Sequence, residues 1–259
     1  MAFVETRAGG RLFQAVSGPA TGAPIVFSNS LGTTHRMWDA VTAILAEQHR
    51  CIRYDTRGHG ASSHDGTPFE IEDLAEDVID LLDSLDLERA HFVGLSLGGM
   101  TGQALALRHP DRLTGMTLIA TSACMPPRES WEARAALVRG KGMQSIVPAT
   151  LERWFTPAFQ SSAAAGAAAD TLRSIDPRGY AACCEAIGRM DFSPVLGGIR
   201  TATTVIAGVE DPATPMPMLR ELHGAVTGSR FVEISPGSHL VAIEQPGRVA
   251  TEIARDVTG

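Results

Sequence analysis

The sequence predicts one α/β domain: a mostly parallel central sheet with helices on both faces and a helical cap insertion. Short runs rich in β-branched residues alternate with amphipathic segments along most of the 259 residues, which is the pattern of a parallel sheet covered by helices. From about residue 124 to about residue 191 the alternation stops and helical sequence replaces it. Apolar residues make up 44% of the chain and charged residues 20%, a balance typical of a globular domain with a substantial core.

The predicted strands are short. Residues 11–16 alternate polar and apolar side chains, which is typical of a strand at the edge of a sheet. Mostly apolar runs indicate strands that are buried on both faces. These runs lie at residues 23–28, 51–54, 90–94, 113–120, 202–208 and 230–234.

Helical spacing of apolar residues predicts the helices between these strands. Ile71, Leu74 and Val78 begin an apolar series that continues to Leu85, while acidic residues occupy the other face. This stretch is therefore expected to be a surface helix that packs on the sheet. Residues 97–109 are expected to form a helix that ends before Pro110, and residues 246–257 the last helix.

The segment 124–191 is interpreted as a helical cap over the carboxyl edge of the sheet. It contains the helical stretches 131–140, 151–155 and 161–173, and the alanine-rich part of the last one favours helix over disorder. The predicted division is a first part of the core at residues 1–123, the cap at 124–191 and a second part of the core at 192–259.

Charge and hydropathy exclude several functional classes. The formal net charge is −7. The chain therefore lacks the positive charge that binds nucleic acid or an anionic membrane surface. No stretch approaches the length of a membrane span, and the N-terminus has no apolar run after a basic start. We therefore expect a cytoplasmic protein without a nucleic-acid or membrane partner; the sequence does not determine its oligomeric state.

No metal or cofactor is expected. The cysteines, Cys51, Cys124, Cys183 and Cys184, lack metal-ligand spacing, and we expect reduced thiols in apolar surroundings. His59, His64 and Asp65 are metal-ligating residue types, but no helical pairing supports a site. We interpret the charged side chains of residues 55–62 as holding this loop in position.

A nucleophile is predicted at Ser96. The sequence Gly94-Leu-Ser96-Leu-Gly98 follows a predicted strand and opens a predicted helix, and this context turns G-x-S-x-G into the nucleophile elbow of the α/β-hydrolase fold. The sharp turn raises the serine hydroxyl out of the sheet. The bare motif is a weak signal, and the strand before it and the helix after it make it a strong one.

A serine hydroxyl needs a base, and that base needs an acid that orients it. In this fold both follow the serine, each in a loop after a late strand. Asp211 follows the predicted strand 202–208 and His239 follows the strand 230–234, so these two residues are the expected acid and base. Glu210 is an alternative acid, and Asp211 could instead cap the helix that begins near Pro215.

The oxyanion of an acyl-transfer reaction also needs donors, which are usually backbone N–H groups. The N–H of Leu97, at the start of a helix, is one candidate. The other is the N–H of Leu31, in the loop after the strand 23–28. In that loop Asn29 and Ser30 stand where His-Gly is common in this fold.

The combined motifs resemble those of the 3-oxoadipate enol-lactonases. The resemblance runs nearly end to end, and its cap segments are the most specific part because the elbow is shared across the whole fold. It also includes the Asn29-Ser-Leu-Gly loop, which supports Leu31 as a donor. The matching segments lie at residues 29–32, 36–38, 53–60, 94–100, 153–155, 179–180 and 184–187, together with Asp211 and residues 213–215.

The resemblance implies hydrolysis of a small lactone, 3-oxoadipate enol-lactone, to 3-oxoadipate in the bacterial breakdown of protocatechuate and catechol. Ser96 would attack the carbonyl while His239 takes its proton, and water would then clear the acyl-enzyme. Because this substrate carries a free carboxylate, the cap should supply a cation and an apolar wall. The candidates are Arg134, Arg153 and Arg189 as cations and Trp131 and Trp154 as walls.

Two other functions remain open on the sequence. Another hydrolase of the same fold, either a broad carboxylesterase or lactonase or a cofactor-free perhydrolase, would share the Ser96, His239 and Asp211 set. A small-molecule receptor that keeps the pocket but signals through a partner would show an exposed apolar cap patch and negligible turnover. A serine at the elbow argues against dehalogenases and epoxide hydrolases, which use aspartate there.

Overall fold

The computed structural model describes residues 2–258, and in that range eight strands form one sheet. The strands are β1 (Ala2–Glu5), β2 (Arg11–Ser17), β3 (Pro24–Ser28), β4 (Arg50–Tyr54), β5 (Ala90–Leu95), β6 (Leu113–Ile119), β7 (Thr203–Gly208) and β8 (Arg230–Ile234). Their order in the sheet is β1-β2-β4-β3-β5-β6-β7-β8. The strands β4, β3, β5, β6, β7 and β8 are parallel to one another, whereas β2 is antiparallel to both of its neighbours.

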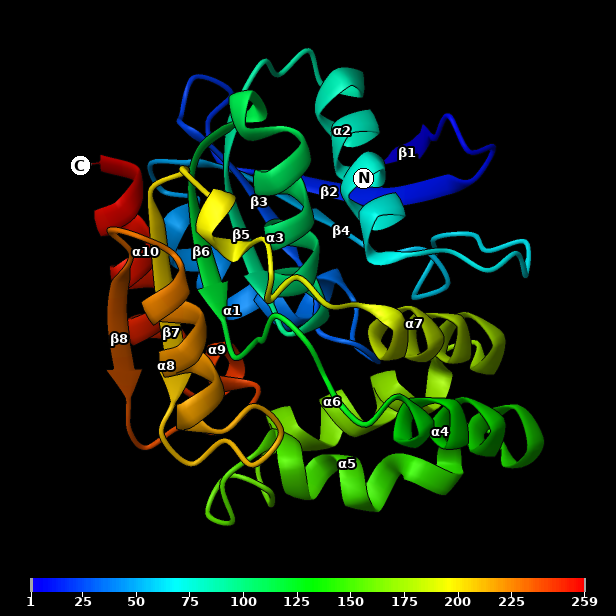
Figure 1. The fold of residues 1–259 in the computed structure, drawn as a ribbon. Coiled ribbons are helices and arrows are strands. Elements are labelled where there is room, and N and C mark those ends of the chain that lie inside the picture. Colours follow the sequence, from blue (N-terminus) through cyan, green and yellow to red (C-terminus); the bar gives the residue numbers. More distant parts are fainter. Residues whose placement is uncertain (1, 259) are drawn as a thin grey trace.

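Helices cover both faces of this sheet (Figure 1). The α-helices are α1 (Asp39–Leu45), α2 (Ile71–Ser84), α3 (Leu97–Arg108), α4 (Arg128–Lys141), α5 (Val147–Trp154), α6 (Ala163–Ser174), α7 (Pro177–Arg189), α8 (Met216–Ala225), α9 (Val241–Glu244) and α10 (Pro246–Thr258). Short 3₁₀ turns occupy His35–Trp38, Pro110–Arg112, Met143–Ile146 and Leu196–Gly198. Helices α2 and α3 pack together on one face, and α1 and α10 on the other. The predicted α/β class is therefore confirmed.

The edge of the sheet differs from the prediction. The strand β2 was expected at the edge, but it lies one strand inward, between β1 and β4. The additional strand β1 has four residues, of which only Val4 is buried, so its sequence carries too little alternation to be recognised. Pairing with β2, from Ala2 opposite Gln14 to Glu5 opposite Arg11, holds it in the sheet.

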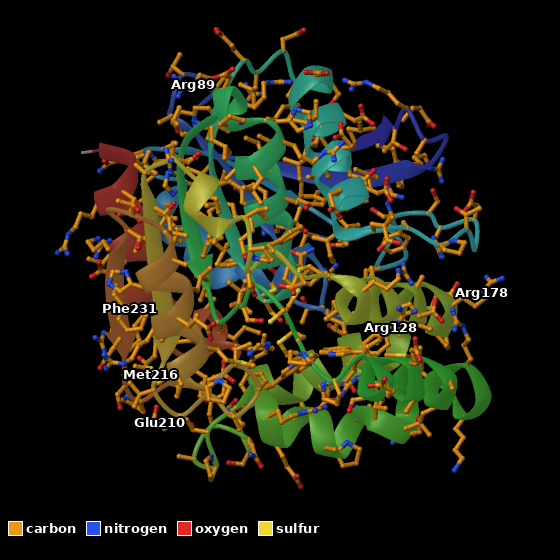
Figure 2. The ribbon with its side chains drawn as sticks, viewed as in Figure 1. Arg89, Arg128, Arg178, Glu210, Met216 and Phe231 are labelled. Carbon is orange, nitrogen blue, oxygen red and sulfur yellow. The ribbon has the colours of Figure 1, made fainter. Side chains whose placement is uncertain are left out.

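The chain between β6 and β7 folds into the helices α4 to α7, which gather at the carboxyl ends of the parallel strands (Figure 1). Side chains fill the space between these helices and the sheet (Figure 2). The segment begins and ends side by side, where Cys124 forms an isolated bridge with Asp191. Ser162 caps α6 by accepting a hydrogen bond from the Ala165 N–H at 3.1 Å. The boundaries of the cap as a separate unit stay a prediction.

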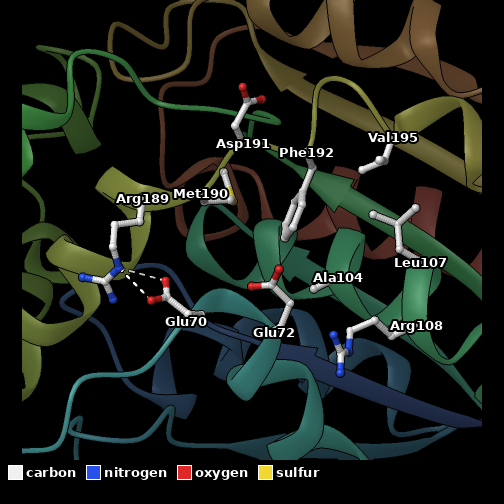
Figure 3. A pocket seen from close by; sticks show the side chains of 10 residues that line it. All are labelled: Glu70, Glu72, Ala104, Leu107, Arg108, Arg189, Met190, Asp191, Phe192 and Val195. Atoms are coloured by element: carbon white, nitrogen blue, oxygen red, sulfur yellow. Dashed lines mark hydrogen bonds and ion pairs between the residues drawn. The ribbon is translucent and has the colours of Figure 1, made fainter.

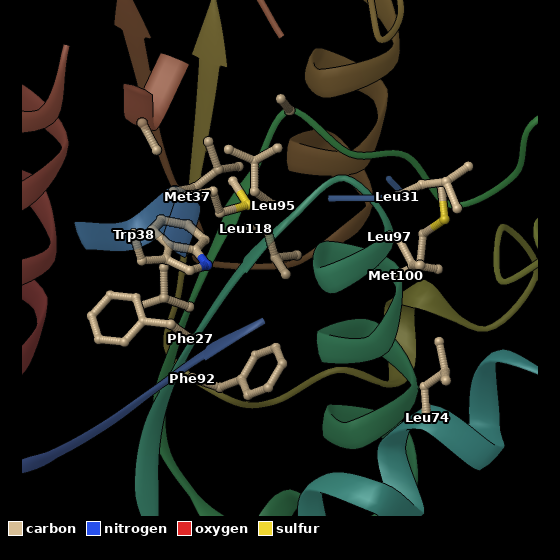
Figure 4. Packing of buried hydrophobic residues seen from close by; sticks show 14 of the residues in the cluster. Phe27, Leu31, Met37, Trp38, Leu74, Phe92, Leu95, Leu97, Met100 and Leu118 are labelled. Carbon is tan, nitrogen blue, oxygen red and sulfur yellow. The ribbon is translucent and has the colours of Figure 1, made fainter. Parts of the chain in front are cut away.

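The main core lies between the sheet and its covering helices. Phe27 and Phe92 from neighbouring strands pack with Leu118 and with Trp38, all fully buried (Figure 4). The Trp38 indole N–H donates to Asn29 Oδ1 at 3.1 Å, so its one polar atom is satisfied. All four cysteine thiols are free, and three of them are buried. None of the described helices is both long enough and apolar enough to span a membrane.

Two buried histidines make the stability of this fold depend on pH. Burial lowers the pKa of His59 and of His91 from 6.5 to about 4. Between these pH values the unfolded chain binds a proton at each position and the folded chain does not, so the free energy of unfolding falls as the pH drops from about 6.5 to about 4. A shift of this size corresponds to about 3 kcal/mol for each histidine.

Urea unfolding followed by circular dichroism between pH 7 and pH 4 measures this effect. We expect unfolding of His91→Gln to take up about one proton fewer than unfolding of the wild type, so its free energy of unfolding should depend less steeply on pH. A free energy of unfolding that stays constant over this range in the wild-type protein would contradict the prediction.

Candidate active site

Ser96 lies at a strained turn between β5 and α3. Its backbone has φ 56° and ψ −113°, a conformation that non-glycine residues rarely adopt. The surroundings hold it there: the Ser96 N–H donates to the Ile119 carbonyl at 2.9 Å, and the Thr121 hydroxyl donates to the Ser96 carbonyl at 2.8 Å. The turn thus has the geometry of a nucleophile elbow.

The two glycines of the motif are required by close packing. A Cβ at Gly94 would lie 2.1 Å from the Gly98 carbonyl oxygen, and a Cβ at Gly98 would lie 2.3 Å from the Ser28 carbonyl oxygen. No L-residue with a side chain fits at such distances. The glycines therefore allow α3 to start directly against β3 and β5.

Asp211 and His239 are brought together from two loops, after β7 and after β8. His239 Nδ1 lies 2.8 Å from Asp211 Oδ2. The other oxygen of Asp211 accepts from the N–H groups of Ala213 and Thr214, at 2.7 and 3.1 Å, and the Thr214 hydroxyl donates to Oδ2 at 2.6 Å. Both side chains are buried. The carboxylate thus holds the imidazole with Nδ1 as the donor and leaves Nε2 free to accept.

Electrostatics keep Asp211 ionised. Burial raises the pKa of this carboxyl, but the charge and hydrogen bond of His239 and the hydrogen bonds from Thr214 outweigh burial, so that its pKa lies below the ordinary value. Glu210, the alternative acid, points elsewhere. It accepts from the Ser235 hydroxyl and from the Gly237 N–H, both at 2.8 Å.

The loop that holds His239 is anchored to the helical segment above the sheet. The Ser238 hydroxyl donates to the Arg153 carbonyl at 3.1 Å, and the Leu240 N–H donates to the Trp154 carbonyl at 2.9 Å. Glu244 bridges the two parts, because its oxygens accept from the N–H groups of Ser238 and Thr156 at 2.5 and 2.7 Å. The end of α5 and the histidine loop therefore form one hydrogen-bonded unit.

Ser96 and His239 line the same cavity, which has a volume of about 170 Å³. Its floor comes from the sheet side, where Leu31 borders it, and its roof comes from α4, α5 and α7. Within residues 2–258, no acidic side chain lines it. The complete set of lining residues is Ser30, Leu31, Ser96, Met100, Met125, Trp131, Arg134, Thr150, Arg153, Trp154, Tyr180, Ile187, Pro212, Ala213, Thr214 and His239.

The predicted oxyanion donors lie near Ser96: Leu31 lines the same cavity, and Leu97 is the next residue of the chain. Leu31 lies in the loop after β3, and Leu97 is the first residue of α3. In the described structure neither backbone N–H donates a hydrogen bond, so both are free for a ligand. His59 supports the loop, because its Nε2 accepts from the Gly32 N–H at 3.0 Å.

Four of the five predicted substrate contacts border this cavity: Trp131, Arg134, Arg153 and Trp154. Two hydrogen bonds hold the Arg134 side chain in place. Its Nε donates to the Tyr180 hydroxyl at 2.7 Å, and an Nη donates to the Thr150 hydroxyl at 2.9 Å. The sequence analysis assigned no role to Thr150 or Thr214. Thr150 lies on α5 three residues before Arg153, and Thr214 lies three residues after Asp211 in the loop between β7 and α8.

Arg153 differs from its neighbours in having no partner. Its guanidinium makes no hydrogen bond or ion pair with any residue of the described chain, although the side chain is half-buried. Burial lowers the pKa of Arg153, and the charge of Arg134 lowers it further. Two neighbouring cations without an acid create a positive field in this cavity.

Arg189 was expected among the substrate contacts, and this placement is corrected. The residue lies at the end of α7 and lines a different cavity (Figure 3). Its Nε donates to both oxygens of Glu70, at 2.8 and 2.9 Å, and an Nη donates to the Phe69 carbonyl at 2.7 Å. Arg189 therefore fastens α7 to the segment before α2.

The segment 55–62 has the structural contacts expected of a pinned loop. Asp55 accepts from the His35 N–H at 2.8 Å and from the Ala61 N–H at 3.0 Å.

Of the residues considered as metal ligands, His64 packs edge-on against Phe69. Across the described residues, no group of three or more His, Cys, Asp and Glu side chains is arranged to hold a metal ion.

Comparisons with known proteins agree with this geometry. The family model of the alpha/beta hydrolase fold matches residues 23–174. The chain is 39% identical to "3-oxoadipate enol-lactonase 2" of Acinetobacter baylyi, over 90% of this chain and 87% of the relative, and 36% identical to "3-oxoadipate enol-lactonase 1" of the same organism, over 94% and 91%. The crystal structure of the enol-lactonase from Burkholderia xenovorans LB400 superposes with a TM-score of 0.96 at 37% identity and covers 100% of both chains.

Identity at this level over nearly the full length of the relatives shows the family as well as the fold. The superposition covers the whole chain, so it includes the helical segment α4 to α7. The chain is therefore a hydrolase and belongs to the 3-oxoadipate enol-lactonase family of the α/β-hydrolase fold.

Proposed function

We propose that this enzyme opens 3-oxoadipate enol-lactone to 3-oxoadipate in aromatic-compound catabolism, through a Ser96-His239-Asp211 triad and an acyl-enzyme. The observation that carries the proposal is that three features meet at one cavity, which no acidic side chain of the described residues lines. They are the strained Ser96 turn, the 2.8 Å contact between His239 Nδ1 and Asp211 Oδ2, and the positive pair Arg134 and Arg153. The names of the relatives supply the substrate.

In the first step the Ser96 hydroxyl attacks the lactone carbonyl while His239 Nε2 takes its proton. The negative charge on the carbonyl oxygen is held by the free N–H groups of Leu31 and Leu97. The bond between the carbonyl carbon and the ring oxygen then breaks. The oxygen leaves as an enolate, which takes up the proton that His239 holds and becomes a ketone. The leaving group is therefore a good one, and His239 is neutral again before the second step.

In the second step His239 takes a proton from water, and the resulting hydroxide attacks the acyl-enzyme. The Ser96 oxygen leaves and recovers a proton from His239. The products are the free carboxylate and the restored enzyme. Asp211 stays ionised throughout and stabilises the imidazolium that forms in both steps.

The test compares kcat/KM for the enol-lactone with kcat/KM for p-nitrophenyl acetate, with peracid formation from acetate and hydrogen peroxide as a third assay. We expect the lactone to be favoured by about 100-fold or more, because Arg134 and Arg153 line the cavity and an anionic substrate can pair with them. An ester preference of similar size would indicate a broad carboxylesterase, and dominant peracid formation a perhydrolase. Either result would overturn the proposed substrate.

Replacing Arg153 should impair recognition of the anionic substrate specifically. Arg153→Met keeps much of the side-chain volume but removes a charge that no group of the described residues neutralises. We expect KM for the enol-lactone to rise by roughly 10- to 100-fold, since hydrogen bonds to charged groups contribute about 1.5–3 kcal/mol. The kcat/KM for neutral p-nitrophenyl acetate should change by less than about threefold.

Arg189→Met is the matched control, because Arg189 lies outside the cavity. Its KM for the lactone should stay at the wild-type value. Equal losses on the charged and the neutral substrate in Arg153→Met would show that Arg153 supports the structure and does not bind the carboxylate.

A further inference from the structure

A second cavity, termed the outer cavity, adjoins the first, termed the inner cavity, and is not used by the reaction above. It has a volume of about 440 Å³ and is formed mainly by α4 and α5 with the segment before α4. This volume is within the range of about 300–1,000 Å³ that small-molecule pockets usually have. Its walls are mostly apolar, from Pro126, Pro127, Leu137, Ile146 and Ala149.

The two cavities share a boundary. Trp131, Arg134 and Arg153 line both of them, and no acidic side chain of the described residues lines either one. Arg134 is already held by Tyr180 and Thr150. The guanidinium of Arg153 therefore stands between the two cavities as a cation without a partner.

We propose that this outer cavity is a binding site for small aromatic carboxylates. The carboxylate would pair with Arg153, and the ring would lie against Trp131 and the apolar wall of Leu137 and Ile146. A ring with one anionic end matches a mostly apolar cavity whose positive charge lies where it meets the first cavity. This inference goes beyond the proposed function, because the ligand has no bond for Ser96 to attack.

The site has a consequence for the reaction. A carboxylate that is held at Arg153 from the outer side competes with an anionic substrate that needs the same guanidinium from the inner side. Aromatic carboxylates should therefore act as competitive inhibitors of lactone hydrolysis. The apolar wall should make them stronger inhibitors than acetate, because the larger ligand buries more apolar surface.

Isothermal titration calorimetry with benzoate tests the site directly and requires no turnover. The chain offers three matched alanine-to-tryptophan variants. Ala149→Trp fills the outer cavity alone, Ala213→Trp fills the inner cavity alone, and Ala136→Trp lies on α4 outside both. Ala136 and Ala149 are exposed and Ala213 is partly exposed, so each indole can be accommodated, and circular dichroism checks the fold.

We expect Ala149→Trp to raise the Kd of benzoate by about tenfold or more, which corresponds to about 1.4 kcal/mol. Ala213→Trp and Ala136→Trp should stay within about twofold of the wild type. Benzamide, which has the same ring without the charge, should bind the wild-type protein at least about tenfold more weakly.

Loss of binding in Ala213→Trp with full binding in Ala149→Trp would place benzoate in the inner cavity and overturn the proposal. Equal affinity for benzoate and benzamide would also overturn it, as would the absence of saturable binding to the wild-type protein. These outcomes are independent of the lactone assay. A protein that prefers esters can still bind benzoate, and an enol-lactonase can fail to do so.

Discussion

Ser96→Ala should abolish hydrolysis while leaving the fold intact. We expect kcat for the enol-lactone to fall by roughly 10⁶-fold, the order of effect seen when the nucleophile of such a triad is removed. The Ser96 hydroxyl has no described hydrogen-bond partner to lose, and alanine tolerates the φ of 56° no worse than serine does. The free energy of unfolding should therefore stay within about 0.5 kcal/mol of the wild type.

The measurements are steady-state rates on the enol-lactone and urea unfolding of the same preparations. Ser161→Ala is a matched control, since Ser161 is an exposed loop residue before α6. It should keep wild-type kcat. Should Ser96→Ala retain more than about 1% of the wild-type kcat, the nucleophile would have to be another group.

Asp211→Asn should reduce kcat by roughly 10⁴-fold, because it imposes the wrong tautomer on His239. Asp211 Oδ1 accepts two backbone N–H groups, from Ala213 and Thr214. The oxygen of an asparagine must stay there, so its NH₂ group takes the place of Oδ2 and faces His239 Nδ1. Nδ1 then has to accept, the proton moves to Nε2, and the ring loses its function as a base.

The neighbouring carboxylate supplies the control for this prediction. Glu210→Gln changes a group that bonds to Ser235 and Gly237 and not to His239. Its kcat should remain within about threefold of the wild type, as is usual for a residue outside the reacting set. A larger loss in Glu210→Gln than in Asp211→Asn would reverse the assignment of the acid. The pH profile of kcat, measured for all three proteins, separates loss of the base from a general structural defect.

Much of the central sheet and the approximate position of the site were predictable because their signals are local. Buried parallel strands are mostly apolar along their length, so β3, β5 and β7 are visible as nearly continuous apolar runs. The Ser96 turn needs glycines on both sides for steric reasons that act within a few residues. Strand β1 had no such signal, since one buried residue in four is too little pattern.

The sequence did not reveal which of the predicted arginines lie at the substrate cavity. Arg153 and Arg189 look alike in sequence: each is an arginine in the last turn of a helix of the same inserted segment. Arg189 is neutralised by Glu70, which is 119 positions away along the chain, whereas Arg153 pairs with no acidic side chain among residues 2–258. Only the way in which α7 packs on the core decides which guanidinium remains free.

The sequence by itself determined the fold class, the Ser96 turn and the order in which Asp211 and His239 follow it, because backbone sterics and hydrophobic burial act on neighbouring residues. The tertiary structure alone decided that Glu210 turns away from His239, that Arg189 is used to hold the fold together, and that a second cavity meets the first at Arg153. These outcomes depend on contacts between segments far apart in the chain, where small rotations of a helix or loop choose one partner over another.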